Sequence, residues 1–274
     1  MISRVDLHLH STASDGQFSP SDLVAMALER NLLAIAITDH DTTEGVNEAL
    51  EAARGTGLEV IPGIEISTDV SREEVHLLGY YIDYHDPALE KKLCAFRQAR
   101  LHRAKEMLAK LAALGFPLQW EMVAELAGGG SVGRPHIAQT MVRMGYVAST
   151  DEAFSLYIGR NGPAYVERYK LSPLEAVSLI KEARGLPVLA HPLKVTHFLP
   201  SLIERGLVGL EVYYNGYSAE DIRELADLAR KFDLIPMGGS DFHGPGVLDT
   251  VEMGGIWVPV ESVKRLRALA KIRV

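Results

Sequence analysis

The chain has 274 residues but only one cysteine, no excess of positive charge and no long apolar run. A single cysteine excludes an intrachain disulfide framework and a cysteine-rich zinc finger, and it is typical of the reducing cytoplasm. The formal net charge of −8 argues against bulk attraction to nucleic acid or to an anionic membrane. No apolar stretch reaches the roughly 18 residues of a membrane span, so we expect a cytoplasmic protein without membrane contact.

Apolar runs of strand length alternate with amphipathic stretches along most of the chain, such as those at residues 20–30 and 44–54. The alternation predicts an α/β fold in which parallel strands are joined by helical crossovers. A length of 274 residues fits either one α/β barrel or two ordinary domains. The predicted strands are residues 5–9, 33–37, 58–66, 75–82, 187–190, 208–213, 234–237 and 256–258.

Strand signals disappear between residues 87 and 163, where apolar residues recur at helical spacing until Gly115. Shorter helical pieces follow around residues 121–126 and 135–144. We predict an inserted helical subdomain at 87–163, with residues 1–86 and 164–274 forming the barrel. The glycine run at 128–133 superficially resembles a phosphate loop, but it lacks a preceding strand and a lysine, which favours a hinge.

Seven of the ten histidines lie in or beside segments where a predicted strand ends. The carboxyl ends of parallel strands in an α/β barrel share one face, so side chains far apart in the chain converge there. Imidazole and carboxylate ligands together suit Mn, Fe or Zn, whereas Ca and Mg prefer oxygen alone. The pattern therefore predicts a multinuclear transition-metal site. The histidines are His8, His10, His40, His76, His136, His191 and His243; the accompanying carboxylates are Asp15, Asp39, Glu65, Glu211 and Asp241.

Individual positions differ in how strongly they indicate a ligand. His8 and His10 are two residues apart on a predicted strand, so both side chains point to the same side. Glu65 taken alone is equally well explained as a helix cap or a surface charge. His76 taken alone is better explained as a hydrogen-bonded core histidine, and only the shared strand-end pattern makes it a ligand candidate.

Arginines in the helical region are candidates for binding a phosphate. Arg97, Arg100 and Arg103 recur every three residues, so neighbouring pairs share a helix face, and guanidinium groups match phosphate oxygens. The alternative is a solvated basic stripe. Arg134 and His136 flank a proline at the start of a predicted helix, where backbone N–H groups and the helix dipole favour an anion.

Five segments together resemble the metal motifs of the PHP (polymerase and histidinol phosphatase) family. The resemblance spans nearly the whole chain, and residues 75–79, the helical insertion and residues 133–136 look like one branch. That branch contains 3′,5′-nucleoside bisphosphate phosphatases and a 5′ to 3′ exoribonuclease. The five segments are Asp6-Leu7-His8-Leu9-His10-Ser11, Thr38-Asp39-His40, Gly63-Ile64-Glu65, Ala190-His191-Pro192 and Gly239-Ser240-Asp241-Phe242-His243.

The resemblance implies a distorted (βα)7, TIM-like barrel whose helical insertion caps the active site. It also implies three divalent metal ions, with manganese expected first and Fe²⁺ or Zn²⁺ as alternatives. The implied ligand sets are His8, His10, Glu65 and Asp241 for one metal; Glu65, His76 and His191 for the second; and Asp15, His40 and His243 for the third.

The implied activity is hydrolysis of the 3′-phosphate of 3′,5′-bisphosphonucleosides, such as adenosine 3′,5′-bisphosphate, by a metal-activated hydroxide. Alternatives are a 5′ to 3′ exoribonuclease on short RNA, a histidinol-phosphate phosphatase and a non-catalytic module built on a metal site; no protein partner is evident. The arginines and His136 would bind the nucleotide, and Asn215 would touch base or phosphate. Asp39 would orient a ligand histidine or shuttle a proton, with His136 as the other catalytic candidate.

Overall fold

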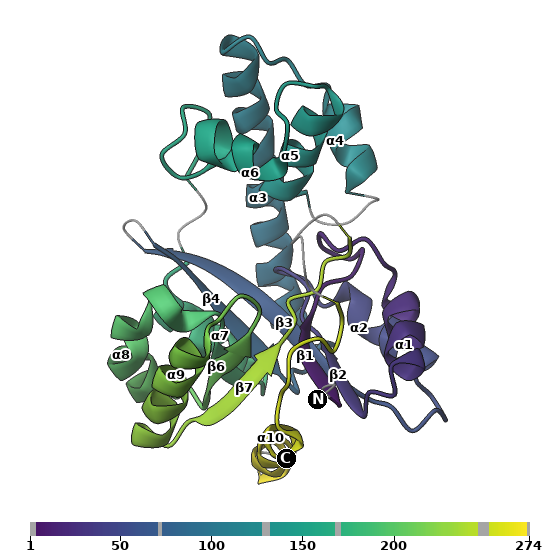
Figure 1. The fold of residues 1–274 in the computed structure, drawn as a ribbon, viewed down its shortest axis with the longest axis vertical. Coiled ribbons are helices and arrows are strands. Elements are labelled where there is room, and N and C mark those ends of the chain that lie inside the picture. Colours follow the sequence, from purple (N-terminus) through teal and green to yellow (C-terminus); the bar gives the residue numbers. More distant parts are fainter. Residues whose placement is uncertain (1–3, 71–72, 128–131, 168–170, 246–251, 273–274) are drawn as a thin grey trace.

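The computed structural model of the chain describes residues 4–70, 73–127, 132–167, 171–245 and 252–272. Seven strands pair in sequence order in one curved sheet, which forms a nearly closed barrel and confirms the predicted α/β barrel (Figure 1). The backbone N–H of His10 donates to the carbonyl of Phe242 at 3.0 Å and links the first strand to the segment after the last. The strands are β1 (Val5–Leu9), β2 (Ala34–Ile37), β3 (Glu59–Val70), β4 (Glu73–Tyr80), β5 (Leu186–Leu189), β6 (Gly209–Tyr214) and β7 (Ile235–Gly239).

Two expectations about the strands are wrong. β4 runs antiparallel to both β3 and β5, whereas the other neighbours are parallel. Only two residues separate β3 from β4, and a connection this short joins only antiparallel neighbours. The strand expected at residues 256–258 is absent from the described chain. Because the segment after β7 already pairs with β1, no edge remains for it, and Val258 instead packs into the core.

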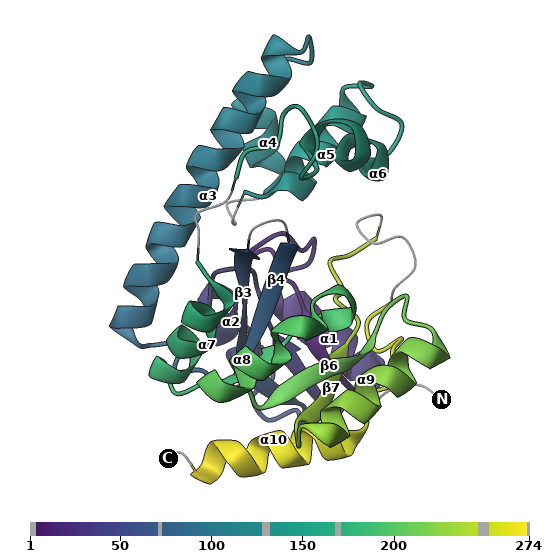
Figure 2. The ribbon, with the colours of Figure 1, turned by 90° about the vertical axis from the view of Figure 1, so that its left-hand side faces the viewer.

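Helices cover the outside of the barrel and one of its ends (Figures 1 and 2). An apolar cluster that includes Leu7, Leu78, Val188 and Met237 fills the interior, and Leu266 of the last helix joins it from the end opposite the carboxyl termini of the parallel strands. Among the described residues, no helix combines the length and apolar character that crossing a bilayer requires. The helices are α1 (Pro20–Glu29), α2 (Glu44–Ala52), α7 (Pro173–Glu182), α8 (Leu199–Arg205), α9 (Ala219–Lys231) and α10 (Val260–Ile272), with short turns η2 (Pro192–Lys194) and η3 (Thr196–Phe198).

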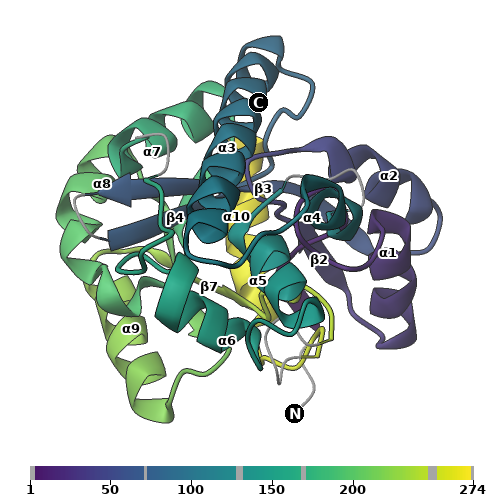
Figure 3. The ribbon, with the colours of Figure 1, turned by 90° about the horizontal axis from the view of Figure 1, so that it is seen from above.

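Residues 87–163, here called the helical segment, lie between β4 and β5 and project beyond the barrel (Figures 1–3). They have an apolar cluster of their own, which includes Met107, Leu111, Val123 and Met141. Of the run at 128–133, interpreted above as a hinge, residues 128–131 lie outside the described residues. The elements are α3 (Pro87–Ala113), α4 (Trp120–Leu126), α5 (Arg134–Arg143), α6 (Thr150–Ala153) and the π-helical turn η1 (Phe154–Ile158).

Candidate metal centre

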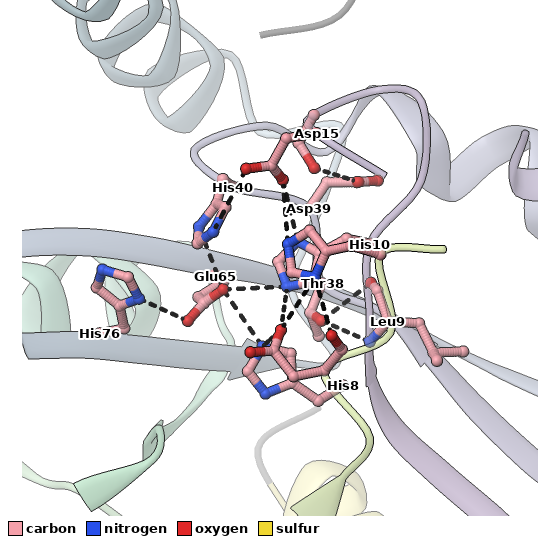
Figure 4. A network of polar contacts seen from close by, with 12 residues as sticks. His8, Leu9, His10, Asp15, Thr38, Asp39, His40, Glu65 and His76 are labelled. Atoms are coloured by element: carbon pink, nitrogen blue, oxygen red, sulfur yellow. Dashed lines mark hydrogen bonds and ion pairs between the residues drawn. The ribbon is translucent and has the colours of Figure 1, made fainter. Parts of the chain in front are cut away.

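All nine predicted ligands lie together at the end of the barrel that faces the helical segment. Figure 4 shows the labelled members pointing toward one another around Glu65. β4 supplies its histidine from its first half, because this strand runs opposite to its neighbours. The ligand positions are His8 in β1, His10 directly after β1, Asp15 in the following loop, His40 after β2, Glu65 in β3, His76 in β4, His191 after β5, and Asp241 and His243 after β7.

Glu65 is the centre of the arrangement. It is 1% exposed, and its two oxygens face different groups of histidines. A carboxylate with both oxygens directed at separate ligand groups is suited to bridging two cations. Oε2 lies 3.1 Å from His40 Nδ1, 3.2 Å from His10 Nε2 and 3.3 Å from His8 Nε2, and Oε1 lies 2.9 Å from His76 Nδ1 and 3.2 Å from His191 Nε2.

Three groups of these side chains bring ligand atoms within 4.8 Å of one another, a spacing at which they could hold a metal ion. One group has the same four members as the first implied ligand set. The other two differ in detail. His10 joins the group that contains Asp15, and in the remaining group His40 takes the place expected for His191. The groups are His8, His10, Glu65 and Asp241; His10, Asp15, His40 and His243; and His40, Glu65 and His76.

Several buried atoms of the cluster have no hydrogen-bond partner among the described residues: both ring nitrogens of His10, His76 Nε2, Asp15 Oδ1 and Asp241 Oδ1. Potential ligand atoms are nevertheless close, since His10 Nε2 lies 3.0 Å from Asp241 Oδ1. An unsatisfied buried polar group costs about 1–3 kcal/mol. Cations placed among these lone pairs would satisfy them together, so the donor set fits several divalent metal ions.

Glu211 is one of the strand-end carboxylates of the predicted metal site, but it belongs to none of the implied ligand sets. Its side chain is fully buried, Oε1 lies 2.9 Å from His8 Nδ1, and Oε2 accepts the backbone N–H of His191 at 2.6 Å. The first contact turns His8 Nε2 toward Glu65. A carboxylate behind a ligand histidine commonly fixes the ring and raises its basicity. Its position at the end of a predicted strand was the available signal.

Tyr214 is a site residue that the sequence patterns did not identify. The Tyr214 hydroxyl donates to Asp241 Oδ2 at 2.8 Å, and burial raises its pKa, so it remains a donor. Tyr213 instead packs edge-on against Trp257 at 5.8 Å. The register shifts between Glu211 and Tyr213, and such an irregularity breaks the two-residue alternation that would place these two on one face.

Asp39 supports the loop after β1. It accepts hydrogen bonds from the Ser11 N–H at 2.7 Å, the Ser11 hydroxyl at 2.7 Å and the Ser14 hydroxyl at 2.6 Å. Burial raises the pKa of this carboxyl. These contacts fix the loop that carries Asp15, whereas the expected hydrogen bond to a ligand histidine is not present in the described chain.

Unusual backbone conformations also orient two of the candidate ligands. His191 and Asp241 have positive φ angles of 27° and 54°, which are uncommon for residues other than glycine and occur often at functional sites. The segment carrying Asp241 is held by Asp6, which accepts the Ser240 N–H at 2.9 Å and the Ser240 hydroxyl at 2.6 Å. Each unusual conformation is thus fixed by surrounding contacts.

The cluster is electronegative. Burial opposes ionisation of Glu65, but the surrounding histidines outweigh it and hold its pKa well below the usual range. Burial likewise opposes protonation of His10, yet the nearby carboxylates of Asp241 and Glu65 raise its pKa to about 10. For His40 burial dominates and lowers the pKa to about 3. Anionic carboxylates surrounding imidazoles in this way attract cations.

A cavity of about 100 Å³ separates the cluster from the helical segment. Asp15, His40 and His76 line it on the barrel side. A larger cavity of about 370 Å³, around Tyr81 and Arg267, includes no member of the three ligand groups in its lining. On the other side the small cavity is lined by Arg100, Arg103, Ala104, Met107, Val132, Gly133, Arg134, Pro135, Ile137 and Phe154, with Glu74 at the β-hairpin.

Two of the predicted phosphate-binding arginines are buried beside this cavity and contact other protein groups. Arg100 forms an ion pair with Asp41. Arg103 donates from Nε to the carbonyl of Val166 at 2.7 Å. Arg134 also lines the cavity. The structure therefore brings these three guanidinium groups toward the candidate ligands.

Three other predicted contacts lie elsewhere or make different bonds. Arg97 donates to Glu90 at 2.6 Å and is not among the residues lining the cavity. Asn215 is half-buried in the turn after β6, and it does not line the cavity either. His136 is 3% exposed, and its Nδ1 accepts the N–H of Gly133 at 3.0 Å, which puts the ring proton on Nε2.

Known proteins share both the sequence and the fold. The chain is 35% identical over 270 residues to a 5′-3′ exoribonuclease of Haemophilus influenzae, and the alignment covers 96% of this chain and 97% of that protein. A 3′,5′-nucleoside bisphosphate phosphatase of Chromobacterium violaceum is 34% identical over 259 residues and covers 89% of each. A model of the PHP domain matches residues 6–119. This chain belongs to the PHP family.

A solved structure extends the similarity to nearly the whole chain. An amidohydrolase of Chromobacterium violaceum, solved with bound sulfate and no metal, has a TM-score of 0.89 and 31% identity, covering 97% of this chain and 96% of that one. With the buried His, Asp and Glu groups, these similarities make the protein a metal-dependent phosphoesterase of the PHP family.

Proposed function

We propose that this PHP protein removes the 3′-phosphate from 3′,5′-bisphosphonucleosides, for example converting adenosine 3′,5′-bisphosphate into AMP and phosphate. The observation that carries the proposal is that candidate metal ligands and three arginines line the same cavity. A substrate with two phosphates can place one at the metals and the other at the guanidinium groups, which bind phosphate oxygens in pairs.

In this proposal the nine candidate ligands hold three divalent cations in the implied sets, with manganese as the first expectation. Bound cations of this kind supply a hydroxide nucleophile at neutral pH and neutralise the charge that develops on phosphoryl oxygens. Glu211 keeps His8 turned toward the site, and Tyr214 holds Asp241 by its Oδ2 atom. Asp39 keeps the loop of Asp15 in place.

His136 acts on the substrate as a neutral hydrogen-bond donor. Burial lowers the pKa of its imidazole, and Nδ1 already accepts a hydrogen bond, so Nε2 carries the proton that a phosphate oxygen can accept. The helical segment serves as a cap, because it contributes the three arginines of the cavity, and His136 lies between the lining residues Pro135 and Ile137. These roles require no serine or cysteine nucleophile.

The second candidate is a 5′ to 3′ exoribonuclease acting on short 5′-phosphorylated RNA. The name of the Haemophilus influenzae relative favours it. The same metals would cleave a phosphodiester, and the arginines would bind the terminal 5′-phosphate. A histidinol-phosphate phosphatase would not need a second phosphate site.

The test is to load the protein with Mn²⁺ and offer adenosine 3′,5′-bisphosphate, a 5′-phosphorylated RNA oligomer and histidinol phosphate separately. Products are identified by mass, and the Asp241→Asn variant serves as the control for contaminating activity. Conversion of the bisphosphate to 5′-AMP with little action on RNA is expected. Stepwise release of mononucleotides from RNA at a higher kcat/KM would replace the proposal with the exoribonuclease, and hydrolysis of none of the three would overturn both.

A further inference from the structure

Arg134, a proposed phosphate-binding group, is paired with a carboxylate across the cavity. Its Nη2 atom donates to Oε1 of Glu74 at 2.7 Å and to Oε2 at 2.9 Å. The pair joins the first turn of α5 to the start of β4, and the two side chains are 14% and 29% exposed. The carboxylate thus occupies a position that phosphate oxygens would take, because both anions bind a guanidinium group in similar geometry.

Glu74 also lies on the site-facing side of its strand. Alternation along β4 puts it on the same face as His76, about 6.6 Å away along the strand, as expected for two residues. The Arg134 guanidinium lies 5.4 Å from the centre of the Phe154 ring, which helps to hold its position. Both Glu74 and Phe154 line the cavity beside His76.

The cavity is too small for a nucleotide while this ion pair is closed. Its volume is about 100 Å³, whereas pockets that hold small organic ligands measure about 300–1,000 Å³. A nucleotide therefore enters by separating groups that line the cavity, and the pair of Glu74 and Arg134 spans it from barrel to helical segment.

We propose that Glu74 is an internal competitor for Arg134 that displaces the 5′-phosphate of the product nucleotide and so promotes its release. The inference rests on the proposed function, since the product of a 3′-phosphatase keeps its 5′-phosphate. Once the 3′-phosphate has been cleaved, the remaining bidentate contact would hold the product tightly. A carboxylate attached to the same protein reforms its own ion pair and replaces that contact.

The test is calorimetric titration of the Mn²⁺-loaded protein with AMP, and with adenosine as the ligand that lacks the phosphate. In Glu74→Gln the competitor loses its charge but keeps its size, so AMP is expected to bind about tenfold more tightly while adenosine binding is unchanged. Glu73→Gln is the matched control, because this neighbour is 42% exposed and pairs with His197 outside the cavity. It should leave the affinity for AMP unchanged.

Glu74→Asp separates competition from simple repulsion. The shorter side chain keeps the charge but loses the reach to Arg134, so competition predicts that it resembles Glu74→Gln, whereas through-space repulsion predicts that it resembles the unmodified protein. AMP affinity that is unchanged or weakened in Glu74→Gln overturns the proposal, as does AMP binding too weak to detect in any of the proteins. Because AMP binding needs no turnover, failure of the proposed reaction is recognised separately in the assay of the three phosphate esters.

Discussion

The barrel side and the helical side of the cavity are suited to binding different kinds of ion. On the barrel side, buried imidazole and carboxylate atoms face one another, and several have no hydrogen-bond partner among the described residues. On the helical side, Arg100 pairs with Asp41 and Arg134 pairs with Glu74. The first arrangement is ready to receive cations, whereas the second is already neutralised and must exchange partners to bind an anion.

The two sides also have separate apolar cores. The interior of the barrel contains a cluster with Leu7 and Met237, and the helical segment contains another with Met107 and Leu111. Only the start of α3, with Leu89 and Leu93, joins an apolar cluster of the barrel part. A change at Arg134, whose partner Glu74 belongs to none of the three ligand groups, therefore need not disturb the ligand geometry. Substitutions on the barrel side should consequently reduce metal binding, whereas substitutions on the helical side should reduce the affinity for substrate.

The largest effect is expected on the barrel side, from Asp241→Asn. The substitution removes a charged oxygen that lies 3.0 Å from His10 Nε2 and 3.2 Å from His8 Nε2, while keeping the shape of the side chain. We expect kcat to fall by at least about 10³-fold, because the metal-supplied nucleophile is lost. Elemental analysis of the purified protein should show a lower metal content in parallel.

The control for this substitution is Asp227→Asn, an equivalent change at an exposed carboxylate that pairs with Arg230 on α9. It should leave both metal content and kcat as they were. Full activity of Asp241→Asn without bound metal would contradict the metal mechanism and remove the basis of the comparison between the two sides.

Much of the barrel side could be predicted from sequence because most candidate ligands lie where a predicted strand ends. His8 and His10 follow the two-residue alternation of a strand, and Asp241 follows an apolar run, so parallel topology alone brings them together. The direction of β4 and the register shift in β6 were not encoded in such patterns. The register shift in β6 is the reason that Tyr214 was missed.

The helical side could be predicted only as far as its helices. Helical spacing identified the positions of Arg100 and Arg134, but their partners Asp41 and Glu74 belong to the barrel and are 59 and 60 residues away in sequence. Such pairings arise from tertiary packing and leave no periodic trace. The sequence therefore indicated candidate anion sites without showing that protein carboxylates contact them.

A smaller effect is expected from Glu211→Gln. This substitution changes a residue that orients the proposed ligand His8, but it changes no proposed ligand. One oxygen of Glu211 faces His8, and the other accepts the N–H of His191, where the glutamine NH₂ group could not accept it. We expect metal affinity to fall by about 10–100-fold, as is typical for such supporting groups. Metal titration would measure it, with Glu224→Gln on the exposed face of α9 as the control. Unchanged affinity would mean that the backbone alone orients His8.

The smallest effect is expected on the helical side, from Arg134→Ala. Loss of one charge-assisted contact should raise KM for the bisphosphate by about tenfold, with a smaller change in kcat, because the contact is made equally in the ground state and the transition state. Arg143→Ala is the matched control, since this arginine is 52% exposed at the other end of α5. Metal content should be unchanged in both variants. A fall in kcat at constant KM would instead place Arg134 at the reacting phosphate, and the division into a cation-binding side and an anion-binding side would fail.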